Sequence, residues 1–264
     1  MMSWGVRELT DRDEILSYLE ADRLYAAYAI GDLETDLFEQ TTWYGAFANG
    51  QLRSLAMLFR GVKVPVLFLM GNTDGIKAIL EQRFSPEPVY INCRPEHMGM
   101  VHEIYLWDEP IAMWRMALNR KRFHGVTGNC IRLTPEHADM LEKFYERGGM
   151  PGFTRGQLGQ GVFYGVFKDG RLIASAGTHL VSRDYNIAAV GNVFTHPEHR
   201  GQGYGAAASG AVSAELVKLG IRDIVLNVGQ RNTSAVHIYE KTGFQCYCSF
   251  FEGSVSLRKQ IKRF

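Results

Sequence analysis

The sequence predicts a mixed α/β fold made of two related halves, and three observations support this prediction. Two segments at a constant offset of 120 residues repeat one strand–turn–strand pattern. A similar short strand and amphipathic helix precede each segment. In the second half, a glycine-rich loop joins a predicted strand to a predicted helix, and another strand follows, which is the element order of an α/β core.

The repeated segment spans residues 43–56, WYGAFANGQLRSLA, and residues 163–176, FYGVFKDGRLIASA, with six of the aligned pairs identical. Its turn is Asn-Gly at 49–50 and Asp-Gly at 169–170. Both dipeptides tolerate the positive φ angles that a two-residue hairpin turn requires. Each segment is therefore predicted to be a β-hairpin.

The lead-ins to the two hairpins begin with VRELT near the start of the chain and with CIRLT at Cys130. In each, a capping Thr or Asp follows the short strand, and an amphipathic helix comes next. The first hairpin continues into VPVLFLM, predicted as a buried strand, then into a turn with the sequence GNTDG and a helix. These parallels predict two halves related by duplication, residues 1–125 and 126–264.

The order of elements in the second half follows from hydrophobic periodicity and turn signals. Apolar residues at helical spacing predict a helix from Gly203 to Leu219, with Gly220 just after its end. Asn232 is placed to cap a short helix that ends at Thr242. The predicted strands are residues 130–133, 162–168, 171–181, 185–195 and 224–228, and a last strand that starts at Phe244.

Composition argues against several classes of function. The chain has 29 basic and 28 acidic residues, so its net charge of +1 predicts neither nucleic acid nor a membrane as a partner. The basic tail, RKQIKRF, is interpreted as a solvated end. The first residues are too charged for a signal peptide. The four cysteines lack CxxC and zinc spacing, so we expect reduced thiols in a cytoplasmic protein without a metal site.

The glycine-rich loop reads HPEHRGQGYGA over residues 196–206. Backbone amides at a helix N-terminus bind anions, glycines let a ligand come close, and Arg200 adds a positive charge, so the loop predicts a phosphate site. The loop also satisfies the G-x-G-x-x-A pattern of dinucleotide-binding folds. However, strands that read as antiparallel precede it, and the next strand ends in Asn227 and Val228 rather than in an acidic residue. A Walker A loop requires Gly-Lys-Ser/Thr, which the sequence lacks here.

Two motifs in this order resemble those of the GNAT superfamily of N-acetyltransferases. Arg200-x-x-Gly203-x-Gly205 is similar to the loop that binds the pyrophosphate of acyl-CoA. NTSAVHIYEKTGF, residues 232–244, is similar to the later N-x-x-A-x-x-x-Y-x-x-x-G-F helix. The resemblance covers residues 128–252 and implies a GNAT domain with a mixed, mostly antiparallel sheet and flanking helices. The first half resembles the degenerate GNAT-like domain of two-domain members, so the whole chain is expected to hold tandem GNAT-like domains.

The resemblance implies acetyl-CoA as cosubstrate, bound between strands 185–195 and 224–228, and no metal. Backbone groups of Val193, Phe194 and Thr195 would pair with the pantetheine arm, and an N–H near Val193 or Phe194 would polarise the thioester carbonyl. The amides that would hold the pyrophosphate are those of Arg200, Gly201, Gln202, Gly203, Tyr204 and Gly205. Asn232 is implied to lie near the cofactor while it caps its own helix.

Tyr239 matches the position that protonates the departing thiolate in many members of the family, and a packed core tyrosine is the alternative interpretation. The attacking amine must lose a proton, and many relatives use a Glu on the fourth or fifth strand for this step. The matching stretches offer Asn192 and Asn227, which are not bases, so our hypothesis is a water chain that both order. The reserve candidates for the base are Glu198, His196 and His237.

We expect the acceptor to be a small-molecule or peptide amine that attacks the thioester directly. One alternative is a non-catalytic acyl-CoA-binding protein, which the missing Glu favours. Another is an acyltransferase that uses a longer acyl chain or an aminoacyl donor, and a dinucleotide oxidoreductase is the remotest. The chain is expected to act as a monomer or a homodimer. Residues 107–116, WDEPIAMWRM, are interpreted either as the lining of an acceptor cleft or as a linker strand and a packed helix.

Overall fold

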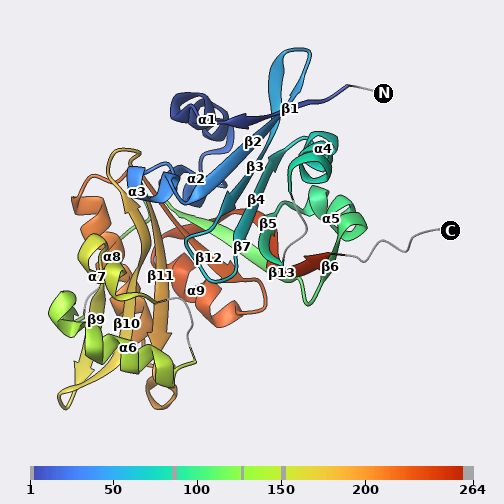
Figure 1. The fold of residues 1–264 in the computed structure, drawn as a ribbon. Coiled ribbons are helices and arrows are strands. Elements are labelled where there is room, and N and C mark those ends of the chain that lie inside the picture. Colours follow the sequence, from blue (N-terminus) through green and yellow to red (C-terminus); the bar gives the residue numbers. More distant parts are fainter. Residues whose placement is uncertain (1–2, 85–87, 126–127, 150–152, 258–264) are drawn as a thin grey trace. The chain divides into compact units, whose positions relative to one another are not determined.

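The fold divides into two compact units, drawn in Figure 1. Unit 1 contains the chain up to Trp114 and the segment from Cys248 on, and unit 2 contains Arg115–Tyr247. The residues that this computed structural model describes are 3–84, 88–125, 128–149 and 153–257.

Unit 1 is built on a sheet with the strand order β1-β2-β3-β4-β5-β13, and β6 also pairs with β13. The pairs β1–β2, β2–β3, β3–β4, β5–β13 and β6–β13 are antiparallel, and the pair β4–β5 is parallel. The strands are β1 (Gly5–Leu9), β2 (Thr41–Ala48), β3 (Gln51–Phe59), β4 (Val66–Gly71), β5 (Val89–Cys93), β6 (Tyr105–Trp107), β7 (Ile111–Leu118) and β13 (Phe244–Leu257). The helices are α1 (Arg12–Leu19), η1 (Glu20–Asp22), α2 (Ala27–Gly31), α3 (Thr35–Phe38), α4 (Thr73–Arg83), η2 (Pro95–His97) and α5 (Met98–Ile104).

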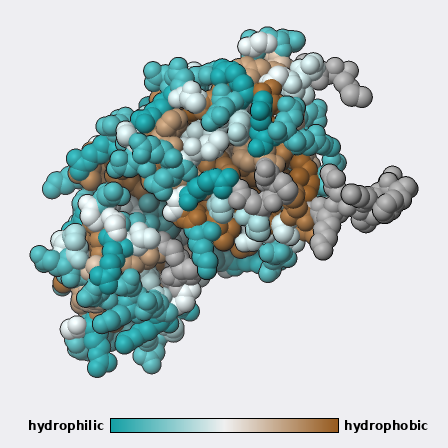
Figure 2. Space-filling view, viewed as in Figure 1, coloured by the Kyte–Doolittle hydropathy of each residue, from teal (hydrophilic) through white to brown (hydrophobic). Residues whose placement is uncertain are grey.

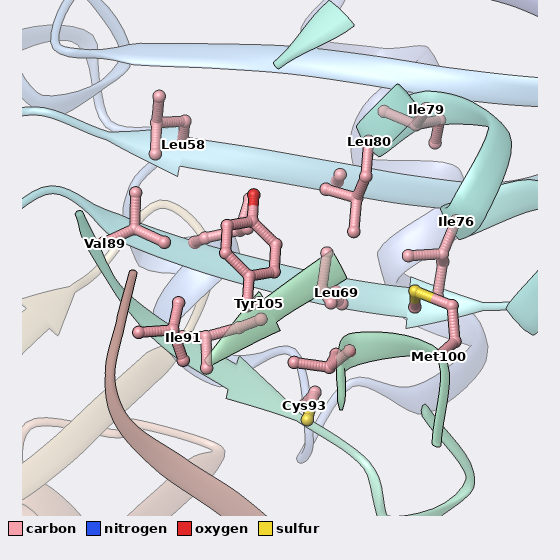
Figure 3. Close-up of a cluster of buried hydrophobic side chains, with 14 of the residues drawn as sticks. Leu58, Leu69, Ile76, Ile79, Leu80, Val89, Ile91, Cys93, Met100 and Tyr105 are labelled. Atoms are coloured by element: carbon pink, nitrogen blue, oxygen red, sulfur yellow. The ribbon is translucent and has the colours of Figure 1, made fainter. Parts of the chain in front are cut away.

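The core of unit 1 lies between this sheet and helices α4 and α5 (Figure 3). Ile76, Ile79 and Leu80 recur at helical spacing on α4 and are buried, so one face of the helix is apolar. They lie over alternate residues of the strands, among them Leu69 and Ile91. The run VPVLFLM is the buried strand β4, as the sequence predicts.

Unit 2 repeats this construction on a sheet with the order β7-β12-β11-β10-β9-β8. Its β11–β12 pair is parallel, and the pairs β8–β9, β9–β10 and β10–β11 are antiparallel. The strands are β8 (Cys130–Arg132), β9 (Tyr164–Lys168), β10 (Arg171–Ser182), β11 (Ile187–Thr195) and β12 (Asp223–Gly229). The helices are η3 (Pro135–His137), α6 (Ala138–Arg147), α7 (Arg155–Gln160), η4 (Pro197–His199), α8 (Tyr204–Lys218) and α9 (Thr233–Lys241).

Helices cover both faces of the sheet of unit 2. Phe194 on β11 packs into a buried cluster with Leu141 and Phe144 of α6. A Cβ added to Gly205, in the first turn of α8, would lie 3.0 Å from the hydroxyl of the next strand residue, Thr195. Since successive side chains of a strand point to opposite faces, α6 and α8 lie on opposite sides of the sheet, as Figure 1 shows.

The two halves share the same strand register, which confirms the repeat. In the first hairpin Tyr44 pairs with Ala56, and in the second Tyr164 pairs with Ala176, again at an offset of 120 residues. Each hairpin then has an irregularity opposite the same part of its first strand. In both halves the next strand, β4 or β11, pairs antiparallel with the hairpin. A helix then leads from it to a strand that pairs parallel with it, giving the units β4–α4–β5 and β11–α8–β12.

Turn chemistry and close packing explain the two glycines that each hairpin of the repeat shares with the other. Asn49 and Asp169 adopt φ values of 52° and 49°, and each is followed by a glycine at positive φ, as the hairpin prediction requires. Gly45 and Gly165 are needed for space, because a Cβ on either would lie 2.6 Å from a leucine methyl group of the facing strand. The side chains of the two hairpins thus pack in the same way.

The boundary between the compact units differs from the division between residues 125 and 126 that the sequence predicts. The boundary falls inside β7, between Trp114 and Arg115, and the last strand, β13, returns from unit 2 into unit 1 at Cys248. The segment 107–116 forms the end of β6 and most of β7, so it contains no packed helix. The apolar alternation of IAMWRMAL in β7 is that of a strand.

Candidate functional site

The N-terminus of helix α8 opens directly after the glycine-rich loop. Gly203 is its N-cap residue, with a φ of +83°, and no side chain caps this end of the helix. The first turn of the helix contains no acidic residue. The first amides of a helix have no acceptor within the helix and carry the positive end of its dipole. The end of α8 is therefore an open donor site for an anion.

The three glycines of the loop serve two purposes. Gly201 and Gly203 have φ values of +75° and +83°, which residues other than glycine rarely adopt. An added Cβ atom at either position would meet nothing within 4 Å. Gly205 leaves little room for a side chain, because an added Cβ would lie 3.0 Å from the Thr195 hydroxyl. The first two glycines thus shape the backbone and leave open space beside it, and the third brings α8 close to β11.

Arg200 is held beside the same loop. Its Nε donates to the carbonyl of Thr195 over 3.2 Å, and its guanidinium lies 5.9 Å from the centre of the Phe194 ring. The residue itself is exposed. A fixed guanidinium next to free helix amides strengthens a site for a phosphate group.

Strands β11 and β12 stop pairing with each other before this loop. Among the described residues their parallel register ends at Val190 and Leu226, although both strands continue beyond these residues. Asn192 adopts a φ of +51°, and the register of β11 with β10 shifts across it, between Gly191 and Phe194. The bulge thus coincides with the end of the ladder between these two parallel strands, and the interval between their unpaired ends is called the gap below.

The bulge at Asn192 is fixed by a residue that the sequence analysis did not single out. The hydroxyl of Tyr145 on α6 donates to the carbonyl of Asn192 over 2.5 Å, and Ser175 donates to the Tyr145 hydroxyl over 2.7 Å. Burial raises the pKa of Tyr145, although the hydrogen bond from Ser175 lowers it, so this phenol stays protonated and donates. The buried aromatic face of α6 is the sequence signal that points to Tyr145.

The two asparagines of the water-chain hypothesis lie just past the end of the paired region. Asn192 is only 7% exposed, and its amide donates to Gln157 of α7 over 3.4 Å. Asn227 is half-buried, and its Oδ1 is a buried acceptor without a hydrogen-bond partner among the described residues. A buried acceptor with no partner costs about 1–3 kcal/mol, so a donor from a ligand or an ordered water would be stabilised there. Asn227 is thus better placed than Asn192 to contact a ligand.

Tyr239 is buried in helix α9, where its ring meets Phe244 edge-on at 6.0 Å between centroids. Asn232 caps this helix, since its Oδ1 accepts from the amide of Ala235 over 3.2 Å. Gly243 ends the segment at a φ of +95°. The predicted N-cap role of Asn232 is confirmed, and the packed position of Tyr239 is compatible with either interpretation of that residue.

The reserve candidates for the base lie elsewhere in unit 2. His196 and Glu198 face each other at 3.8 Å between Nδ1 and Oε2 in η4, beyond the end of β11. At about 3.3 Å per strand residue, His196 lies roughly 13 Å along the chain from Asn192. His237 is exposed on α9. The structure therefore does not bring these three side chains to the bulge.

The equivalent helix end in unit 1 is closed by its own chain. Asn72 is the N-cap of α4, and its Oδ1 accepts from the amides of Asp74 and Gly75 over 2.9 and 3.3 Å. Asp74 also adds a negative charge to the first turn. Ser54 fills the space beside Gly75, where an added Cβ would lie 2.3 Å from its hydroxyl. Of the two helix ends, only that of α8 is open to an anion.

No group of three or more His, Cys, Asp or Glu side chains in the described part of the chain is placed to hold a metal ion. None of its helices is both long and apolar enough to span a membrane.

Comparison with known proteins agrees with this geometry. Residues 129–244 match the model of the acetyltransferase (GNAT) family. That segment contains the loop, strands β11 and β12, and helix α9. No curated protein matches the sequence.

Solved structures match over nearly the whole chain at low sequence identity. A Drosophila protein is 16% identical with a TM-score of 0.71, covering 96% of this chain and 98% of its own. A GCN5-related N-acetyltransferase from Kribbella flavida is 14% identical with a TM-score of 0.64, covering 90% and 96%. A tandem GNAT protein from the clavulanic acid biosynthesis pathway is 12% identical with a TM-score of 0.57, covering 97% and 98%. At these identities the likeness shows the fold, and the last match agrees with the internal repeat.

Proposed function

Through residues 129–244 the chain belongs to the GNAT acetyltransferase family, and from this premise we propose that it is an N-acetyltransferase that transfers acetyl from acetyl-CoA to a primary amine. The family implies an acyl-CoA donor. The observation that carries the proposal is the open N-terminus of α8, where Gly201 and Gly203 leave space beside free amides and Arg200 stands next to them. These residues fit the diphosphate of coenzyme A.

The pantetheine arm would lie along β11, in the gap between β11 and β12. His196 donates its amide to Ile173 on β10, so in the antiparallel alternation Phe194 also faces β10, opposite Ser175. The backbone groups of Val193 and Thr195 then face away from β10, toward the gap. We therefore assign the proposed backbone contacts to Val193 and Thr195, and Phe194 becomes a packing residue.

Acetyl transfer needs an electrophilic carbonyl, a deprotonated amine and a protonated leaving group. The amide of Val193 would polarise the carbonyl, because it is a fixed donor at the edge of the gap. The Oδ1 of Asn227 would accept from the amine or from a water that takes its proton, which would satisfy this buried atom. Tyr239 would protonate the departing thiolate, whose conjugate acid has a pKa of about 8.5. Holding the amine against the thioester would supply much of the acceleration.

The test follows labelled acetyl groups from acetyl-CoA to a panel of primary amines and peptides, for the wild-type chain and Tyr239→Phe. We expect transfer by the wild type, and a loss of turnover of about 10²-fold or more in the variant with little change in acetyl-CoA affinity. Binding of acetyl-CoA without transfer to any amine would favour the non-catalytic acyl-CoA-binding protein. Tighter binding of longer acyl-CoAs in calorimetry would favour a longer-chain acyltransferase. Unchanged turnover in Tyr239→Phe would remove this residue from the mechanism.

A further inference from the structure

Strand β10 contains a second bulge in the sheet of unit 2, and His179 is its extra residue. Thr178 pairs with Val190 and Leu180 with Ala189, so β10 uses one residue more than β11 between these two pairs. Bulges often lie next to active sites, where they re-aim a side chain. His179 is an exposed strand residue that belongs to neither family motif, so no sequence pattern marks it.

The imidazole of His179 lies directly on the backbone of Gly191, across the β10–β11 pair. A Cβ added to Gly191 would lie 2.0 Å from both Cδ2 and Nε2 of this ring. Gly191 does not have a positive φ, so space and not backbone conformation explains the glycine. The ring therefore occupies the place of a side chain on β11, one residue before the bulge at Asn192.

This ring lies on the face of the sheet that α6 covers. Gly191 pairs with Gly177, and a Cβ on Gly177 would lie 2.1 Å from the ring of Phe163. Phe163 belongs to the buried cluster that includes Leu141 of α6. Directly paired residues of neighbouring strands point to the same face of a sheet, so the imidazole on Gly191 also lies on the α6 face. The surface around α6 and the β9–β10 hairpin is mostly hydrophilic (Figure 2), which suits the approach of a polar amine.

The same face carries the side chain of Asn227, beside Gly191. The parallel register pairs Val190 with Leu226, and Gly191 and Asn227 are the next residues of their strands. Side chains alternate along both strands, so those of residues 191 and 227 point to the same face. The imidazole of His179 and the Oδ1 of Asn227 thus lie together at the end of the β11–β12 ladder, where the gap begins.

The position of His179 fits the distance that acetyl transfer requires. At about 3.3 Å per strand residue, Gly191 lies at most ~7 Å from Val193, whose amide is the proposed donor to the thioester carbonyl. An amine nitrogen about 3–3.5 Å from the thioester carbon and about 2.6–3.2 Å from a base spans nearly this distance. The chain around the ring desolvates it and lowers the pKa of His179 from its ordinary value of 6.5, although the residue keeps an exposed side. The imidazole is therefore neutral at pH 7 and can accept a proton.

The side chains described above around the bulge do not act as bases. Asn192 and Asn227 are amides, and so is Gln157, which accepts from Asn192. Tyr145 donates its hydroxyl hydrogen to the carbonyl of Asn192. A base on β10 thus accounts for a site in which neither β11 nor β12 provides a Glu.

We propose that His179 is the general base of the acetyl transfer. This inference rests on the proposed function and names the proton acceptor of its reaction. As the amine attacks, the N–C bond forms and the nitrogen becomes more acidic, and the imidazole of His179 takes its proton. The C–S bond breaks, and the thiolate takes the proton of the Tyr239 hydroxyl. His179 then gives its proton to solvent and Tyr239 takes one from solvent, so protons balance over the cycle.

The experiment measures kcat for acetyl transfer to the panel of primary amines and peptides at saturating acetyl-CoA, with calorimetry of coenzyme A binding and urea unfolding beside it. The proteins are the wild type, His179→Gln, Gly191→Ala, the double variant and the control His237→Gln. Glutamine keeps hydrogen-bonding groups but does not take up a proton at neutral pH. Gly191→Ala leaves His179 in the chain and displaces its ring, because the new Cβ would occupy the same place. His237 is an exposed histidine of α9, and its change is the same substitution as that of His179.

We expect His179→Gln and Gly191→Ala each to lower kcat about 10²-fold with little change in coenzyme A affinity, and the control to keep the turnover of the wild type. Because both changes act on one ring, the double variant should be no slower than His179→Gln alone.

Wild-type turnover in His179→Gln overturns the inference but leaves the proposed function intact, and so does a double variant in which the two losses multiply. A loss of turnover that comes with an equal loss of coenzyme A affinity, or with unfolding under the assay conditions, means a structural role for His179 and also overturns the inference. Absence of transfer by the wild type to every amine of the panel contradicts the proposed function and the inference together.

Discussion

The loop before α8 allows backbone strain to be separated from ligand binding. Gly203 and Gly220 stand at the two ends of the same helix, with φ values of +83° and +81°, and an added Cβ at either would meet nothing within 4 Å. An alanine in this left-handed conformation costs about 1–2 kcal/mol. Gly203→Ala and Gly220→Ala are therefore expected to destabilise the chain by similar amounts in urea unfolding.

Only the Gly203 variant is expected to change ligand affinity. Its Cβ would enter the open space beside the free amides, where the diphosphate would lie. A loss of about 1.4 kcal/mol or more of binding free energy there means a dissociation constant at least tenfold larger. Gly203→Asn sharpens the comparison, because asparagine tolerates this conformation better than alanine but has a larger side chain. We expect Asn to cost less stability than Ala and to weaken coenzyme A binding at least as much.

The measurement is calorimetric titration with coenzyme A next to urea unfolding, with all four proteins at one salt concentration. Gly203→Asn that binds coenzyme A as tightly as the wild type would refute the assignment of the α8 amides to the diphosphate. Equal loss of affinity in Gly220→Ala would mean that stability, and not contact, controls binding.

Three further predictions concern single residues. Tyr145→Phe leaves the Asn192 carbonyl and the Ser175 hydroxyl without this partner, so it should cost about 1–3 kcal/mol in urea unfolding, and a change near zero would mean that the bulge is held by other contacts. Asn72→Ala removes the cap of α4 and should cost about 1 kcal/mol while coenzyme A affinity stays the same; weaker binding would place a donor site in unit 1. Burial raises the pKa of Asp32 to about 7. Because the folded state then favours the protonated acid, its contribution is full below the unfolded pKa of about 4 and is lost as the pH rises to about 7. Asp32→Asn should reduce this fall in stability between pH 4.5 and 7.5, and identical pH profiles of the two proteins would show that Asp32 does not cause it.

Local signals made most of the fold predictable. The hairpin turns, the helix from Gly203 to Leu219 and the cap at Asn232 depend on residues that are neighbours in the chain, and α8, with its preceding N-cap and following Leu219, lies where the pattern places it. The duplication was predictable because the hairpins share six identical pairs, and the glycines among them lie at the turn and at close packing contacts. The family motifs then located the candidate site on the right elements.

Features that depend on distant residues were not predictable from one sequence. Nothing next to Asn192 in the chain indicates its left-handed conformation, which Tyr145 fixes from 47 residues away. Ligand approach is the expected reason for all three loop glycines, whereas Gly205 lies where an added Cβ would come within 3.0 Å of the Thr195 hydroxyl. The concave surface lined by Met140, Arg171 and His199 combines residues from α6, the β9–β10 hairpin and η4, so no local pattern marks it.

The path of strand β13 has a consequence for how this protein can be taken apart. Its last residues pair with β5, so the first half of the sequence does not by itself contain the strand that borders β5. A peptide cut near the midpoint would leave β5 with a bare edge of unpaired amides and carbonyls in one fragment, and an orphan strand in the other. Separate expression of the two repeats is thus expected to give fragments that aggregate and that fold into a soluble complex only when they are mixed. This is expected even though each repeat carries its own complete hairpin pattern in the sequence.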